Sequence, residues 1–129
     1  IHAMNRYRRK FAKQFEQQGL DVLLSPAFAL PAMCHDDGID LLPAGSHAML
    51  QNLVGGPGGM VPWSTVLEGE ETDRQANRDG AIRRAIKTET DSVGLPVGVQ
   101  VSSLPWQEHR VLAVMRELQH DIRSRQCSG

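Results

Sequence analysis

The stretch GLPVGVQVSSLPWQEHRVL, residues 94–112, decides the fold, because it predicts a buried strand that breaks sharply into a helix. Its first half alternates apolar residues with small or polar ones, the period-two pattern of a strand. The apolar positions are Leu95, Val97, Val99 and Val101. The small alternates leave room for another layer to pack close on that face. Ser103 is expected to cap the next helix, with Pro105 in its first turn, where a missing amide proton costs nothing.

Helical and extended patterns alternate through the rest of the chain. Helices are expected near residues 4–15, 47–54, 74–87 and after 103, and strands near 21–25, 60–66 and 95–102. The continuous apolar run in the first strand is typical of a strand covered on both faces, as in a parallel sheet flanked by helices. Ser46 is placed to cap the second helix, and Pro62 favours an edge position or a bulge. This order predicts α/β layering in a single domain.

Bulk properties exclude several classes of function. A chain of 129 residues with net charge −1 lacks the excess charge that nucleic-acid or anionic-membrane binding uses. Cys34 and Cys127 lie far apart and suggest neither a disulfide framework nor a metal-ligand pair, which favours a reducing, intracellular compartment. The chain enters a helical pattern directly after Ile1, which suggests that it continues a longer protein.

Residue patterns alone predict no catalytic, metal or cofactor site. The Cys34–Asp37 loop offers metal-ligand side chains, but neighbouring residues point in different directions and no second cluster completes a shell. The GGPGG run, residues 55–59, lacks the Lys-Ser/Thr pair of a phosphate-binding loop, so a tight turn or close backbone packing is expected there. The Ser102-Ser103 pair has no base beside it in sequence. Glu108-His109 is expected on an exposed helical face, and His47 and His120 stand alone.

Longer stretches resemble the amidase-signature family of serine hydrolases. Residues 94–119, GLPVGVQVSSLPWQEHRVLAVMRELQ, are similar to that family's Gly-Leu-Pro-Val-x-Val-Gln strand and to the Leu-Pro-Trp-Gln-Glu start of its last helix. Residues 7–32 resemble its helix and Asp-Val-Val-Leu-Thr-Pro strand. Residues 47–66 resemble its Tyr-Thr-Met-Leu-Tyr-Asn helix and Val-Pro-Val-Thr-Thr-Val strand. The resemblance covers nearly the whole chain and is strongest to members that act on fatty acid amides.

This resemblance implies an α/β fold, with a twisted mixed β-sheet flanked by α-helices. Residues 1–129 would form the C-terminal part of a single amidase-signature domain. Family members hydrolyse acyl amides with a nucleophilic serine, a bridging serine and a lysine base. No Gly-Ser-Ser-Gly run occurs here, and Lys10, Lys13 and Lys87 lie in polar helical patterns. The resemblance therefore implies that this segment has no catalytic residues and that it supplies structure and part of an acyl-binding tunnel.

One residue is a candidate for substrate binding. Met49 matches a tunnel-lining methionine of the family, on a helix whose apolar face includes Leu50 and Leu53. The alternative is that Met49 fills the core, since methionine adapts to irregular gaps. The chain departs from the family at Pro57-Gly58-Gly59, where relatives have Pro-Ala-Gly, and it has no aromatic residue in the segment 68–91, so the substrate stays open.

Two functions from different classes are compatible with the sequence. In the first, the intact protein is an amidase whose partners are an acyl amide substrate and, for this segment, the remainder of the amidase chain. A homodimer and an association of the intact protein with a membrane both stay open. In the second, residues 1–129 are a standalone non-catalytic α/β module that binds an apolar ligand or a partner. Unpaired apolar strands favour the first.

Overall fold

The computed structural model describes residues 1–35 and 37–127, with side chains described up to residue 125. Its elements are α1 (His2–Gln17), β1 (Leu23–Pro26), the 3-10 helix η1 (Leu42–Gly45), α2 (Ser46–Val54), β2 (Gly58–Thr65), α3 (Gly80–Glu89), β3 (Pro96–Ser102) and α4 (Glu108–Cys127). The predicted α/β class and the alternating order of helices and strands are confirmed. None of the helices described here combines the length and the apolarity needed to cross a bilayer.

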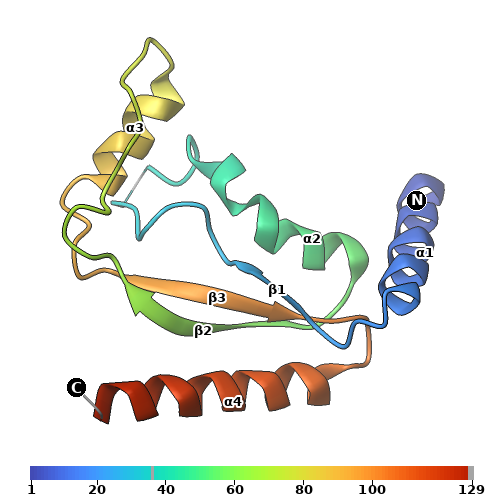
Figure 1. Cartoon of the computed structure of the whole chain (residues 1–129). Helices are drawn as coiled ribbons and strands as arrows, with labels where there is room; N and C mark the ends of the chain where they lie inside the picture. Colours follow the sequence, from blue (N-terminus) through green and yellow to red (C-terminus); the bar gives the residue numbers. More distant parts are fainter. Residues whose placement is uncertain (36, 128–129) are drawn as a thin grey trace.

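The three strands form one sheet, and β3, the strand predicted from residues 94–102, lies at its centre (Figure 1). β1 pairs antiparallel with one side of β3, from Leu23 opposite Ser102 to Pro26 opposite Val99. β2 pairs antiparallel with the other side. Burial of β3 is confirmed only for its second half: its first two residues are exposed, whereas Val101 and Ser102 are fully buried.

The first strand differs from the expectation. The apolar run in residues 21–25 suggested a strand covered on both faces in a parallel sheet. Instead, β1 runs antiparallel to β3 at an edge, and Leu24 is 50% exposed. α4 packs mainly on β2 and β3 rather than on β1, which leaves the outer part of that face open. A short apolar run does not by itself distinguish an edge strand from a central one.

The structure confirms both predictions for Pro62, an edge strand and a bulge. β2 lies at the other edge of the sheet, and its register with β3 shifts between Pro62 and Ser64. Proline has no amide proton for the ladder, so an edge or a bulge is where a strand tolerates it. The small residue Gly98 of β3 is covered by the neighbouring strand rather than by another layer, because the Met60 side chain of β2 lies across it. A Cβ on Gly98 would stand 2.5 Å from the Met60 sulfur.

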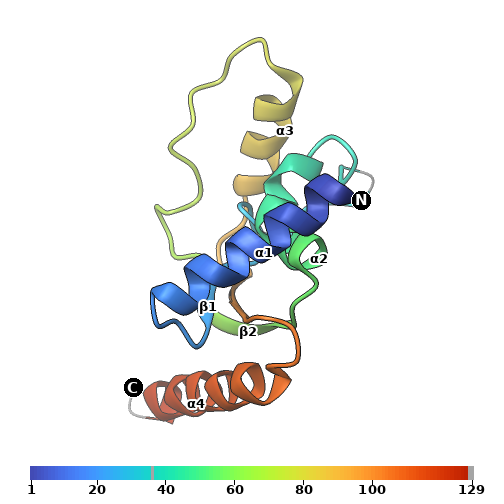
Figure 2. The same ribbon diagram turned by 90° about the vertical axis from the view of Figure 1, so that its right-hand side faces the viewer.

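Helices cover both faces of the sheet (Figures 1 and 2). α4 packs on one face, where the buried core includes Val61, Val101 and Val111. On the opposite face the Gln51 side chain of α2 lies over Gly58, with Cγ 3.4 Å from where a Cβ would be. α1 packs against α2 on the side away from α4.

Two predicted helix starts are wrong. α3 begins at Gly80 rather than near residue 74, because Asp79 caps it by accepting a hydrogen bond from the Ala81 amide at 2.8 Å. Ser46 lies inside α2 and does not cap it. The chain enters α2 through η1, and the Ser46 amide donates to the Pro43 carbonyl within that 3-10 turn.

Ser103 also has a role other than the predicted cap. Its hydroxyl donates to the Asp21 carbonyl at 2.7 Å, and its amide donates to the Pro57 carbonyl at 3.2 Å. Pro105 lies in a turn before α4, which begins only at Glu108. Ser103 therefore joins the end of β3 to the segment before β1 and to the glycine-rich loop.

The glycine-rich loop shows the predicted turn and close packing. Gly55 ends α2 with φ of 76°, a left-handed conformation that glycine adopts without steric cost. At Gly56 a Cβ would overlap the Ser103 carbonyl oxygen and stand 2.9 Å from Gln51 Oε1. The glycines thus let the backbone of the loop lie directly against the end of β3.

Candidate functional site

The serine pair and Lys87 have partners that serve the fold. Ser102 Oγ donates to the Leu23 carbonyl at 3.3 Å, and Ser103 Oγ donates to the Asp21 carbonyl, so both hydroxyls tie β3 to the β1 segment. Lys87 Nζ lies 3.4 Å from Asp37 Oδ2. The other two lysines are exposed on α1.

The acidic loop at residues 34–37 is likewise structural where the structure describes it. Asp37 is buried, and its carboxylate pairs with Arg84 Nη1 at 3.0 Å as well as with Lys87. Asp36 lies outside the described residues. Within the described part of the chain, no three His, Cys, Asp or Glu side chains lie close enough together to hold a metal ion.

A largely apolar cavity of about 660 Å³ lies at the end of the sheet where β3 begins. Its apolar walls come from the segment after β1, from β2 and from β3, and they include Phe28, Met33, Met60 and Val97. Glu70, Glu71 and Glu89 also line it. Apolar walls with a few polar groups are typical of pockets that bind small molecules.

Two close contacts shape this cavity. The Met60 side chain lies across Gly98, where a larger residue would displace it. Phe28 packs on Gly45, with ring Cε2 3.2 Å from where a Cβ would be. Gly45 ends η1 and immediately precedes α2, so the wall formed by Phe28 is fixed against the start of that helix.

The three glutamates that line the cavity are held in place by hydrogen bonds. Glu89 is only 7% exposed, and its carboxylate accepts hydrogen bonds from Thr72 Oγ1 at 2.6 Å and from Arg74 Nε at 2.7 Å. Glu70 accepts a hydrogen bond from the Leu67 amide, and Glu71 accepts one from the Gly69 amide. Two donors, one of them charged, offset the cost of burying the Glu89 carboxylate.

Met49 lies outside the core of the described residues, with 43% of its surface exposed. It does not line the 660 Å³ cavity. Gly45 lies four residues before it and the exposed Leu53 four residues after it, so the three share one side of the helix. Met49 is therefore one turn along α2 from the point where the cavity wall packs on Gly45.

Sequence reasoning did not find this cavity, because no helix or strand was expected between residues 26 and 46. The available signal was the apolar content of PAFALPAM, residues 26–33, which is high for a loop. In the structure Leu30 packs with Leu41 and Ala85 as a small second core. This core holds the segment in place as a cavity wall.

Comparisons with known proteins give the chain a family context. The family model described as Amidase matches residues 1–112. Fatty acid amide hydrolase 1 of Caenorhabditis elegans is 33% identical over 116 residues, which cover 88% of this chain and 20% of that relative. Fatty-acid amide hydrolase 1 of Sus scrofa is 34% identical over 125 residues, which cover 92% of this chain and 21% of the relative. The chain thus spans about a fifth of the length of these curated relatives.

Proposed function

The chain belongs to the amidase family, and from that membership we propose that the protein it forms part of hydrolyses acyl amides. The observation that carries this proposal is the identity of 33% and 34% to two fatty acid amide hydrolases over most of the chain. The reaction proposed for the intact protein is acyl transfer. A serine attacks the amide carbonyl, the amine leaves with a proton, and water then hydrolyses the acyl-enzyme.

We propose that residues 1–129 are the C-terminal part of a single amidase-signature domain and contribute no catalytic residue. The nucleophilic serine, the bridging serine and the lysine base would come from the part of the relatives' length that this chain does not span. Within this chain, the hydrogen bonds of Ser102 and Ser103 to backbone carbonyls support a structural role for that pair. The segment would supply part of the acyl-binding surface through Met49 and the neighbouring apolar side of α2.

Exposed apolar surface supports the remainder of the amidase chain as the partner of this segment. Leu24 and Leu112 are among the large apolar side chains that the described residues leave exposed, and neither lines a cavity described above. β1 also offers unpaired backbone groups along its outer edge. Open strand edges and large exposed apolar patches are sites where further protein packs.

The test compares two proteins. The full-length protein that carries this chain should hydrolyse a long-chain acyl amide and should be labelled by a fluorophosphonate probe at a serine outside residues 1–129. The 129-residue chain alone should show neither hydrolysis nor labelling. Stoichiometric labelling of a serine within residues 1–129 would show that the segment does hold a nucleophile. A full-length protein without amide hydrolysis would refute the proposed activity.

The alternative, a non-catalytic binding module, has one observation in its favour. The residues that line the 660 Å³ cavity all belong to this chain, which gives the chain a candidate ligand pocket of its own. Thermal unfolding of the 129-residue chain discriminates between the two functions. A sharp, reversible transition of a monodisperse chain that saturably binds an apolar ligand would favour the module. Aggregation relieved by co-expression of the preceding segment would favour the amidase part.

A further inference from the structure

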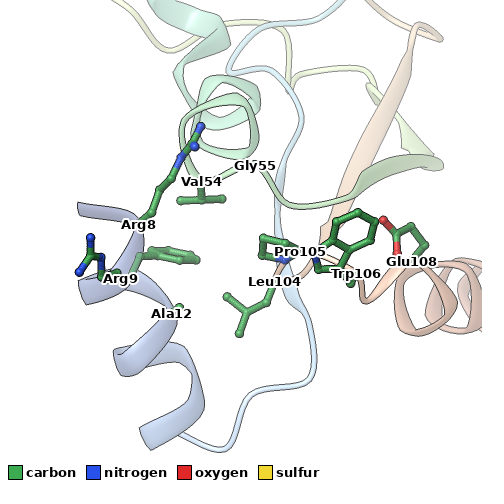
Figure 3. Close-up of a pocket in the computed structure, with 10 residues that line it drawn as sticks. Arg8, Arg9, Ala12, Val54, Gly55, Leu104, Pro105, Trp106 and Glu108 are labelled. Carbon is green, nitrogen blue, oxygen red and sulfur yellow. The ribbon is translucent and has the colours of Figure 1, made fainter. Parts of the chain in front are cut away.

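A second cavity, here called the arginine cleft, lies where α1, the C-terminal end of α2 and the turn between β3 and α4 meet (Figure 3). Its volume is about 510 Å³. Most of its lining is apolar and comes from all three elements: Phe11, Ala12, Val54, Leu104 and Pro105. On the α1 side, Arg8 reaches toward Gly55 and the Arg9 guanidinium points away from the cleft, and Trp106 and Glu108 stand on the opposite side.

Arg8 and Arg9 carry positive charge, and neither forms an ion pair with a carboxylate in the described part of the chain. Arg8 Nε donates to the Leu53 carbonyl at 2.6 Å, which holds its guanidinium at the end of α2 beside Gly55. α1 as a whole carries five Arg and Lys side chains and a single carboxylate, Glu16. Charge complementarity therefore calls for an anion on the α1 side of the cleft.

The opposite wall is held in a strained conformation. Trp106 has φ of 68°, in the left-handed region, and follows Pro105 in a turn closed by a hydrogen bond of 3.3 Å from the Gln107 amide to the Leu104 carbonyl. Turns with proline second and a positive φ third normally have glycine at that third position. The Trp106 side chain is 85% exposed, so packing within this chain does not explain the conformation. Strain of this kind is concentrated at ligand-binding sites.

From these observations we infer that the arginine cleft binds an acyl-chain monocarboxylate. The carboxylate pairs with the Arg8 guanidinium beside Gly55, because a guanidinium presents paired donors that match the two oxygens of a carboxylate. The acyl chain lies over Leu104 and Pro105 toward the Trp106 ring. Glu108 lies beyond Trp106 on the side away from the arginines, so it disfavours a ligand with a second negative charge.

This inference goes beyond the proposed hydrolysis and does not depend on it. An acyl-chain monocarboxylate is also the class of product that hydrolysis of an acyl amide releases, so the cleft could retain that product on the protein. Binding is nevertheless a property of residues 1–129 alone. A failure to bind would leave the proposed activity intact, and a failure of the activity would leave the binding result intact.

Tryptophan fluorescence gives a local test, because the chain has two tryptophans in different places. Trp106 lines the cleft, whereas the Trp63 ring lies under the Arg125 guanidinium, 4.8 Å away, between β2 and α4. The probe is 11-bromoundecanoate, whose bromine quenches a nearby indole, used below its micelle concentration with the 129-residue chain. Saturable quenching is expected in Trp63→Phe, which keeps only Trp106. Little quenching is expected in Trp106→Phe, which keeps only Trp63.

Charge variants and competitors complete the test. Arg8→Gln should weaken binding about tenfold, since it removes a charge-assisted hydrogen bond. Lys13→Gln, on the same helix but outside the cleft lining, is the matched control and should leave the dissociation constant unchanged. Arg8→Gln also loses the contact with the end of α2, so Arg8→Lys, which keeps the positive charge and should retain most of the affinity, keeps the test informative if Arg8→Gln unfolds. Undecanoate should displace the probe, and undecylamine and undecanedioate should not.

Three results would overturn the inference. The first is displacement of the probe by undecylamine as effective as by undecanoate, because charge would then play no part. The second is an equal loss of affinity in Lys13→Gln and Arg8→Gln, which would indicate a diffuse attraction to α1. The third is quenching that occurs only above the micelle concentration or with anionic vesicles, which would assign the surface to a membrane rather than to a single ligand.

Discussion

The backbone of Gly59 in β2 lies directly against the Met115 side chain of α4. A Cβ on Gly59 would stand 2.8 Å from Met115 Cε, and closer still to the sulfur. The same point is 3.9 Å from Val111 Cγ1, an ordinary van der Waals contact. The absence of a side chain at Gly59 therefore sets how closely α4 approaches the face of the sheet where Val61 and Val101 are buried.

Gly59→Ala should lower the free energy of unfolding by about 1–3 kcal/mol, the usual cost of overpacking a core. The added methyl group forces Met115 to rotate or α4 to move away from the sheet. Urea denaturation of the 129-residue chain measures the change. Gly80→Ala is the matched control, because a Cβ there has no neighbour within 4 Å and its φ is not positive. It should leave stability unchanged or raise it by about 0.5–1 kcal/mol. Equal destabilisation by both substitutions would contradict the Gly59–Met115 contact as the cause.

Glu89→Gln should destabilise the chain by about 1–3 kcal/mol. The Glu89 carboxylate is buried and accepts hydrogen bonds from Thr72 and Arg74, and an amide in its place loses the charge-assisted bond and presents a donor toward the guanidinium. Chemical denaturation provides the measurement. Asp73→Asn removes a neighbouring but exposed carboxylate and should change stability by less than about 0.5 kcal/mol. If the two variants unfold at the same urea concentration, the buried ion pair contributes nothing measurable.

Trp106→Gly should raise the stability of the unliganded chain by about 0.5–1 kcal/mol. A non-glycine residue in the left-handed region costs roughly 1–2 kcal/mol, and part of that gain is offset by the larger unfolded-state entropy of glycine. Little packing is lost, because the ring is largely exposed. Melting temperature without ligand is the readout, and a decrease would show that the indole contributes packing that its exposure does not reveal.

The local sequence pattern predicted the order of the helices and strands correctly. It failed where a side chain bonds to a residue that is distant in the sequence. The Ser103 side chain is suited to a helix cap, but its hydroxyl donates to the carbonyl of Asp21, 82 positions earlier in the chain. The start of α3 is another case, because residues 74–79 are polar apart from Ala76, and Arg74 pairs with Glu89 instead of extending the helix. Only the tertiary arrangement supplies these partners.

The candidate sites were less predictable than the fold for the same reason. The walls of the larger cavity come from Phe28, Met60 and Val97, which lie on three different segments. Their proximity depends on the pairing of β2 with β3 and on the packing of Phe28 against Gly45, neither of which has a signature in local sequence. Met49 was identified through family resemblance alone, and the exposed position that the structure gives it could not be deduced from helical periodicity.

Met49→Ala in the full-length protein should change the preference among acyl chain lengths more than the turnover of a short substrate. Contacts to the remote part of an acyl chain act through kcat/KM for long substrates, so the long-to-short ratio of kcat/KM should fall roughly tenfold. The measurement is kcat/KM for a series of acyl amides that differ only in chain length. Met4→Ala is the matched control, since Met4 is a methionine of similar exposure, 37%, on α1. It should leave the ratio unchanged. An unchanged ratio in Met49→Ala together with a lower melting temperature would assign Met49 to packing in the intact domain rather than to substrate binding.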